Sequence, residues 1–373
     1  MFTSGLGNQC GCDTKEFLAS GPSHSIWVSD HSNDDEQMSP SLRLIERLAN
    51  ENRSLCFMGD SIDHQFYDAL TLNIERSILL RSNSSHIQIK AHEIPLNYTN
   101  KTGPSLYSSR GFRYASHLKQ TVVSIQQEHE IIETKFTYMK HYGWAPGDTS
   151  HLDDCDIVIT NLGLHYSAKT GNLTNPYSDP TPIPTLGDGI LASIIHLADF
   201  ASSDTDKIAI WRSALPQHFD TMDGHYMESA RKDQKCTPLK PYSVGDDRVI
   251  QQYNTIYNEK FAELREYPGV QSNQSLTCDA YESKVRVNRT RMDLPTVYKY
   301  YIEKKCCLKR LERLKQGDAS VTATVLRWDL TDLFDVPFWH SSDGDCSHFC
   351  YIPALYEAAF ERLDLLIPPL TGS

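Results

Sequence analysis

Residues 55–62 read Leu-Cys-Phe-Met-Gly-Asp-Ser-Ile, a short apolar run that ends in Gly59, Asp60 and Ser61 and leads into a helical pattern. A strand that delivers a serine onto a sharp turn, with a helix starting directly behind it, can expose a nucleophilic hydroxyl. Ser61 is therefore the candidate nucleophile. The same tripeptide also occurs in ordinary turns and helix N-caps, so the assignment depends on the rest of the chain.

A serine nucleophile needs a base within hydrogen-bond reach and a group that orients the base. Residues 343–350 read Asp-Gly-Asp-Cys-Ser-His-Phe-Cys and precede a helical pattern that begins at Ile352. Asp345 stands three residues before His348 and can support the imidazole while His348 reaches Ser61, because such groups meet in space rather than in sequence. Without Ser61, a loop carboxylate and a capping histidine would be an equally good interpretation.

Length, composition and charge favour a globular chain of 373 residues, with one large α/β domain or two modest ones. Hydrophobic residues make up 39% and charged residues 23%, and the formal net charge is −12. This charge argues against nucleic acid as the main partner, because phosphate binding depends on clustered Lys and Arg.

Ten cysteines and seven Asn-x-Ser/Thr sequons indicate an oxidising, glycosylating compartment. The sequons begin at Asn52, Asn83, Asn97, Asn100, Asn172, Asn273 and Asn288. The cysteines lack zinc-like paired spacing, so no metal site is predicted. The chain has neither a signal-peptide pattern nor an apolar run of about eighteen residues. We therefore expect a fragment of a lumenal protein, attached to a membrane only through an anchor outside this chain.

Alternating strand and helix patterns predict an α/β fold with a mainly parallel sheet. Residues 1–53 are expected to form an irregular covering segment with one short helix, residues 54–367 the main domain, and residues 368–373 a tail. The expected strands are 54–58, 112–115, 121–125, 134–138, 157–160, 207–211 and 321–330. The expected helices are 40–50, 63–80, 186–200, 248–265, 298–314 and 352–367.

Polar residues follow two of these strands, at the sheet edge where ligands bind in open parallel sheets. Asn161, Gly163 and His165 come after the strand at 157–160, and could donate to a developing oxyanion. A plain loop is an equal reading of that stretch. Arg212 follows the strand at 207–211 and could bind a substrate anion or sugar hydroxyls, with a surface salt bridge as the equal alternative.

Four blocks of the chain resemble the PC-esterase branch of the SGNH (GDSL-type) hydrolase superfamily, in particular the plant trichome-birefringence-like O-acetyltransferases. The blocks are Gly59-Asp60-Ser61 with Gln65, Asn161-x-Gly163-x-His165-Tyr166, Trp211-Arg212 followed by His218-Phe219, and Asp345-Cys346-Ser347-His348-Phe349-Cys350. The last block is close to the family signature Asp-Cys-x-His-Trp-Cys. The resemblance spans residues 54–367.

The resemblance implies a three-layer α/β/α fold and a catalytic triad of Ser61, Asp345 and His348. It implies acyl transfer through an acyl-serine intermediate onto polysaccharides, in the Golgi lumen. No cofactor would be bound, and the acetyl donor, with acetyl-CoA as a candidate, would be a co-substrate. The family's oxyanion donors are the nucleophile's N–H, a glycine and an asparagine. Gly163-Leu164-His165 stands where the family has Gly-x-Asn, so both Asn161 and His165 are candidates for the asparagine's role.

Several alternatives stay open at this point. Water as the final acceptor would make the same machinery an esterase, because the difference lies in acceptor binding and water exclusion. A glycan-binding protein that no longer catalyses is a second class of function. A lipase or thioesterase ranks lower, since no long apolar lid segment is evident.

Asp63-His64 departs from the plant proteins, which weakens any transfer of substrate identity. At least one of Cys346 and Cys350 is expected to be disulfide-bonded.

Overall fold

A computed structural model describes residues 38–80, 87–95, 117–127, 130–140, 154–162, 206–219, 325–335 and 345–370. It also describes residues 190, 193, 194, 197, 200, 201, 236, 237, 256, 258, 259 and 340. Predictions for the strand at 112–115, the helix at 298–314, Gly163, His165 and every sequon asparagine except Asn52 lie outside these residues.

The described part of the chain forms a seven-stranded sheet in the order β2-β3-β4-β1-β5-β6-β7. Its strands are β1 (Leu55–Gly59), β2 (Ile87–Pro95), β3 (His117–Gln127), β4 (Glu130–Lys140), β5 (Ile157–Thr160), β6 (Ile208–Arg212) and β7 (Val325–Trp328). Five strands, from β4 across to β7, run parallel, while β2, β3 and β4 form an antiparallel meander at one edge. The predicted α/β class with a mainly parallel sheet is confirmed.

Strand β1 lies in the centre of the sheet. It pairs with β4 on one side, where Leu55 is level with Phe136, and with β5 on the other, where Leu55 is level with Ile157. All five of its residues are buried. A central parallel strand is covered on both faces and therefore reads as a continuous apolar run, which is the pattern that predicted it.

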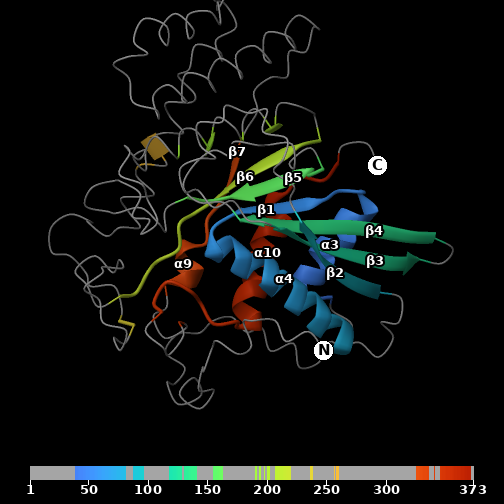
Figure 1. Cartoon of the computed structure of the whole chain (residues 1–373), viewed down its shortest axis with the longest axis horizontal. Helices are drawn as coiled ribbons and strands as arrows, with labels where there is room; N and C mark the ends of the chain where they lie inside the picture. The colour runs from blue at the N-terminus through green and yellow to red at the C-terminus, as the bar shows by residue number, and fades with distance from the viewer. Residues whose placement is uncertain are drawn as a thin grey trace, which may run out of the picture.

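Three helices cover one face of the sheet: α3 (Pro40–Asn50), α4 (Ser61–Leu80) and α10 (Pro353–Leu366) (Figure 1). Helix α3 begins with the Ser39 hydroxyl accepting from the Leu42 N–H and with proline in its first turn, both common start signals. Arg47 joins α3 to α10 by donating to the Asp364 carboxylate and to the carbonyl of Ile367 at the end of that helix. A cation there complements the helix dipole.

Side chains of successive strand residues enter two different cores. Leu55, Phe57 and Ile159 pack with the three helices on one face. Met58 and Val158 pack on the other face, against a second group that includes the buried helical residues Ile190, Ile194 and Leu197. This alternation follows from the pleat of a strand, whose neighbouring side chains point to opposite faces.

Most sequence predictions of individual elements hold within a few residues. The helix at 40–50 has the predicted bounds, whereas β1 begins and ends one residue later than expected. Helix α4 begins at Ser61 rather than at residue 63, because the Asp60 carboxylate accepts from the Ile62 N–H and thereby caps the helix earlier. The sequence patterns missed strand β2 and the short helix α9 (Thr331–Phe334).

Candidate active site

Ser61 is the first residue of α4, and only Asp60 separates it from Gly59, the last residue of β1. The turn between them is tight: a Cβ placed on Gly59 would lie 1.8 Å from Oδ2 of Asp63. Only glycine allows the strand to approach the helix this closely. Tyr138 donates from its hydroxyl to the carbonyl of Asp60, at 3.0 Å, and so fixes the turn from β4. Strand, turn and helix therefore place the Ser61 hydroxyl at the carboxyl edge of the sheet.

Ser61, His348 and Asp345 form one hydrogen-bonded chain. Nε2 of His348 lies 2.6 Å from Oγ of Ser61, and Nδ1 of the same ring lies 2.6 Å from Oδ2 of Asp345. Since a carboxylate only accepts, His348 donates from Nδ1, and neutral His348 then accepts the Ser61 proton at Nε2. This polarity is the one that a general base for a serine nucleophile requires.

The surroundings of His348 make it a stronger base than an ordinary histidine. Burial alone would lower the pKa of His348, but the hydrogen bond and charge of Asp345, helped by the charge of Asp60, raise it above its usual 6.5. Burial raises the pKa of Asp345, but its hydrogen bond to His348 and the charge of that ring outweigh burial and bring the net pKa below 3.8. The carboxylate is thus ionised and stabilises an imidazolium.

The His348 loop, residues 345–350, is held by α4 through Gln65. Nε2 of Gln65 donates to the Phe349 carbonyl at 2.9 Å, and its Oε1 accepts from the Phe349 N–H at 3.3 Å. Within the loop, Oδ1 of Asp345 accepts from the N–H groups of Ser347 and His348. Gln65 lies one helical turn after Ser61, so the same helix positions both the Ser61 hydroxyl and the loop that carries His348.

Disulfides also fasten the His348 loop. Cys346 pairs with Cys236, 110 residues away in sequence, and Cys350 is disulfide-bonded as well. Both cysteines are buried. The prediction that at least one of the two is disulfide-bonded is confirmed.

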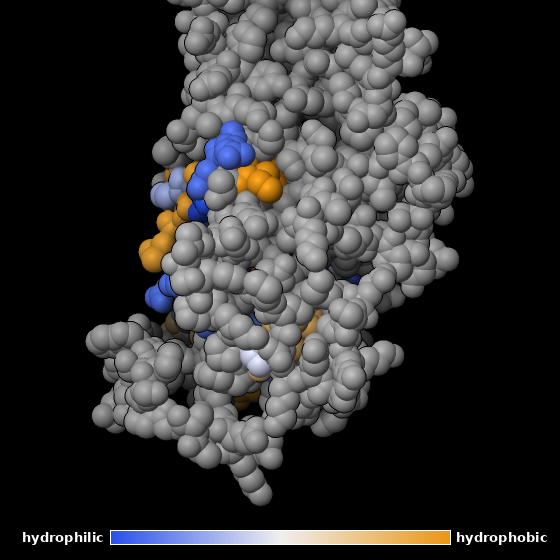
Figure 2. Space-filling view, turned by 90° about the vertical axis from the view of Figure 1, so that its left-hand side faces the viewer, coloured by the Kyte–Doolittle hydropathy of each residue, from blue (hydrophilic) through white to orange (hydrophobic). Residues whose placement is uncertain are grey.

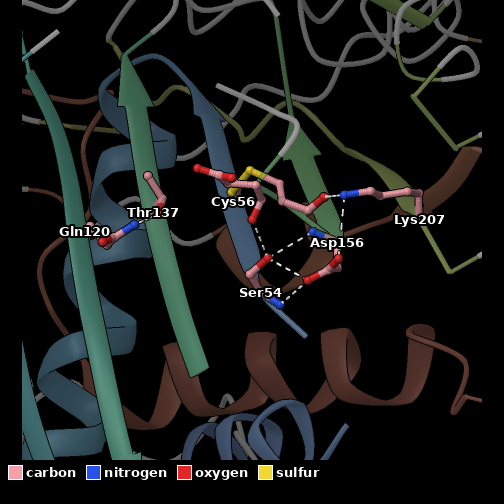
Figure 3. The surroundings of a disulfide bond; sticks show 8 residues. Ser54, Cys56, Gln120, Thr137, Asp156 and Lys207 are labelled. Atoms are coloured by element: carbon pink, nitrogen blue, oxygen red, sulfur yellow. Dashed lines mark hydrogen bonds and ion pairs between the residues drawn. A yellow bond between two sulfur atoms is a disulfide. The ribbon is translucent and has the colours of Figure 1, made fainter. Parts of the chain in front are cut away.

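Another disulfide, Cys56–Cys155, joins β1 to the residues just before β5 (Figure 3). Next to it, Asp156 accepts from both the N–H and the hydroxyl of Ser54, each at 2.7 Å, and lies 3.6 Å from the Lys207 ammonium. These contacts lie at the amino ends of the parallel strands. They fix the two central strands at the opposite end of the sheet from Ser61.

Arg212 lies at the carboxyl end of β6, as predicted, but its side chain is only 1% exposed. Nε of Arg212 donates to Oδ1 of Asp63 at 2.9 Å, and the guanidinium stacks over the ring of Phe66 at 5.3 Å. Loss of water raises the pKa of Asp63 to about 7, because the opposing charge of Arg212 does not fully compensate burial. The Arg212–Asp63 pair packs against the turn that carries Ser61, because Asp63 lies beside Gly59. Contact of Arg212 with a substrate stays a prediction.

Asn161 directly follows β5 and is 3% exposed. Its Nδ2 donates to the Arg212 carbonyl at 2.8 Å and links the ends of β5 and β6. Because β5 is the neighbour of β1, Asn161 and Ser61 share the carboxyl edge of the sheet. Gly163 and His165, the other predicted oxyanion residues, lie outside the described residues, so the choice between Asn161 and His165 stays open.

Sequence patterns did not identify Gln217 and His340 as contacts of this site. Gln217 donates to the Ser347 hydroxyl at 2.7 Å, and His340 contacts the His348 carbonyl through Nδ1 at 2.8 Å. His340 stands eight residues before His348, in a stretch without clear periodicity. A local pattern offers no signal for such contacts, because they depend on how the loop folds back.

Comparison with known proteins gives no assignment: the chain matches none of the known protein-family models, and no curated protein matches it either.

Figure 2 shows the side of the molecule toward which the parallel strands point. Both hydrophilic and hydrophobic side chains of the described residues reach the surface there.

Among the described residues, no helix is long and apolar enough to cross a bilayer. Within the same part of the chain, no group of three or more His, Cys, Asp and Glu side chains is arranged to hold a metal ion.

Proposed function

We propose that this chain is a serine-dependent O-acyltransferase that moves an acetyl group to hydroxyls of a polysaccharide or glycan through an acyl-serine intermediate. The observation that carries the serine chemistry is the hydrogen-bonded chain from Ser61 through His348 to Asp345, with both bonds at 2.6 Å. A serine, a correctly polarised imidazole and an ionised carboxylate are the parts that acyl transfer requires.

In the proposed mechanism, Nε2 of His348 takes the proton of Ser61 as Oγ attacks the acetyl carbonyl of the donor. The imidazolium, stabilised by Asp345, then protonates the leaving group, and the acetyl group remains on Ser61 as an ester. A glycan hydroxyl, deprotonated by His348, attacks this ester and regenerates the serine. The Ser61 N–H, at the N-terminus of α4, is a natural donor to the oxyanion, joined by Asn161, Gly163 or His165.

The glycan acceptor is supported by other observations than the serine chemistry. They are the family resemblance of the four sequence blocks and the combination of seven sequons with disulfides, which fits a lumenal compartment such as the Golgi. Apolar side chains on both faces of the sheet support the three-layer arrangement of SGNH hydrolases. With water as acceptor, the same residues would act as a carbohydrate acetylesterase.

The test uses the purified glycoprotein with an acetyl donor, with and without xylan-type oligosaccharides. We expect acetylated oligosaccharide from the wild type and none from Ser61→Ala. Ser124→Ala is the matched control, because Ser124 lies on β3 and bonds the side chain of Glu133. Free acetate that depends on Ser61 but not on acceptor would identify an esterase. Glycan binding without labelling of Ser61 by a fluorophosphonate would instead identify a binding protein.

A further inference from the structure

A pair of buried histidines lies directly behind the His348 loop. His218 is 0% and His340 is 5% exposed, and neither takes part in the mechanism proposed above. Nδ1 of His218 and Nε2 of His340 are 2.6 Å apart, within hydrogen-bond distance. The two rings therefore share one hydrogen bond and are both buried.

Each end of this pair faces a group that can only accept a hydrogen bond. Nδ1 of His340 lies 2.8 Å from the carbonyl oxygen of His348, and Nε2 of His218 lies 3.2 Å from Oδ1 of Asp335. Both outer ring nitrogens must therefore carry hydrogen. The bond between the two rings requires one more N–H.

Three hydrogen bonds thus need three N–H groups, whereas two neutral imidazoles have only two. The third proton resides on a ring rather than on Asp335. The side chain of Asp335 is 42% exposed, so water stabilises its carboxylate. An ordinary imidazole, with a pKa of about 6.5, also holds a proton more firmly than an ordinary carboxyl, with a pKa of about 3.9.

The outer nitrogen of His218 faces a carboxylate and that of His340 faces a carbonyl, so the geometry places the extra proton on His218. Burial, together with the charge of His218, lowers the pKa of His340 to about 3, so His340 stays neutral and keeps its hydrogen on Nδ1. The imidazolium of His218 then faces its counterion Asp335. Asp345 and His348 also face the pair: the carboxylate of Asp345 favours the cation, and a protonated His348 opposes it.

The pair contacts the His348 loop on both sides of His348. The His218 N–H donates to the Cys346 carbonyl at 3.0 Å. The ring of His340 packs on that of Phe349, with centroids 4.2 Å apart, and the backbones of the same two residues form an isolated β-bridge. Loss of any of the three hydrogen bonds through His218 and His340 would therefore loosen the loop that carries His348, the proposed base.

We propose that His218 and His340 are positioning residues that together hold one proton more than two neutral imidazoles, and that this proton keeps the His348 loop in place. The positioning role rests on the proposed function, whereas the extra proton does not. Deprotonation at alkaline pH would leave one of the three hydrogen bonds without its hydrogen. The stabilisation that this proton provides is therefore lost as the pH rises into the range where the pair releases the proton.

The substitution Asp335→Asn removes the need for the extra proton but keeps the three hydrogen bonds. The Asn amide can donate to Nε2 of His218, so all three hydrogen bonds form between neutral rings and no extra proton is needed. Asp329→Asn is the matched control. It removes a carboxylate six residues earlier, where Asp329 is exposed and accepts from Thr331.

The test measures histidine protonation by NMR of the 15N-histidine-labelled chain at about pH 7.5. We expect one imidazolium in the wild type and in Asp329→Asn that is absent from Asp335→Asn. We also expect the melting temperature of the wild type to fall more than that of Asp335→Asn between about pH 6 and about pH 9. Identical histidine spectra, or identical melting profiles in all three proteins, would overturn the shared proton.

The positioning role is tested by the rate at which a fluorophosphonate labels Ser61. In the wild type this rate should fall at alkaline pH, and in Asp335→Asn the fall should be absent. An equal alkaline fall in both proteins, with the imidazolium present, would overturn positioning and leave the proton established. If Ser61 is never labelled, the proposed function fails, while the spectra and melting profiles still decide the proton.

Discussion

Gln65 and Phe349 exchange two hydrogen bonds across 284 residues of sequence, with the side-chain amide of one bound to the backbone N–H and carbonyl of the other. The pair joins the helix that begins at Ser61 to the loop that carries His348. Since Gln65 is 7% exposed, water cannot easily replace its bonds. The distance between Ser61 and His348, the proposed nucleophile and base, should therefore depend on this contact.

Replacing Gln65 by Leu should misplace His348 while the sheet stays intact. We expect a loss in kcat of roughly 10²-fold, because a misplacement of about 1 Å can cost this much. Stability should fall by about 1–3 kcal/mol, as the Phe349 backbone groups lose their buried partners. Rates and melting temperature would be measured together. Gln120→Leu, which removes a bond to Thr137 on the β3–β4 meander, is the control and should keep its rate.

The pH dependence of Ser61 labelling should follow His348. Only neutral His348 can accept the proton, so the rate should rise with pH through a midpoint above 6.5, in line with the raised pKa. Asp345→Asn removes the main cause of that shift, so the midpoint should move to lower pH and the maximum rate should fall by roughly 10³-fold or more. A midpoint that stays in place in Asp345→Asn would contradict the assignment of Asp345.

Asp345 should also stabilise the folded protein, and this contribution should be lost in acid. Its pKa is lowered on folding, so its contribution is present above the ordinary carboxyl value of 3.8 and is lost as the pH falls through the lower folded value. Thermal unfolding of the wild type and Asp345→Asn should therefore converge in acid. Melting curves at several pH values test this, and a constant difference down to the most acidic pH would contradict it.

The disulfides Cys236–Cys346 and Cys56–Cys155 should differ in what their removal affects. Replacing Cys236 and Cys346 by Ala frees the His348 loop, so labelling of Ser61 should fall even at temperatures where the protein stays folded. Replacing Cys56 and Cys155 by Ala should lower the melting temperature and leave the rate of the folded protein nearly unchanged. The two loops are similar, at 110 and 99 residues, and each cross-link is worth about 4–5 kcal/mol by chain entropy.

Reductant offers the same test without mutation. We expect mild reduction to lower the wild-type rate before the domain unfolds. An unchanged rate with the thiols of Cys236 and Cys346 shown to be free would rule out a role of this disulfide in holding the loop.

Gly59→Ala should destabilise the Ser61 turn. The new methyl group would overlap Oδ2 of Asp63, which is itself fully buried and held by Arg212. Forcing an extra carbon into such a site costs about 1–3 kcal/mol. Chemical denaturation of Gly59→Ala, Asp63→Ala and the double variant would test this cause. Because Asp63→Ala removes the clashing atom, the double variant should lose less stability than the sum of the single losses.

The amino-acid sequence by itself determined the local elements and the chemistry available to them. The apolar run before Gly59 predicts a buried core strand, and the helical pattern that follows predicts a helix that starts just behind Ser61. Asp345 and His348 are three residues apart, so their pairing is a local property of one loop. These predictions succeed because backbone propensity, capping and burial act over a few neighbouring residues.

Only the tertiary structure decided which distant residues meet. Ser61 and His348 are 287 residues apart in sequence, and their contact depends on the sheet order, on Gln65 and on the disulfide from Cys346. The partner of Arg212 was also decided by the tertiary structure. The sequence around Arg212 fits a surface residue equally well, but the fold buries its side chain against Asp63. Side-chain pairs of this kind are chosen by packing across the whole chain, and no local pattern encodes them.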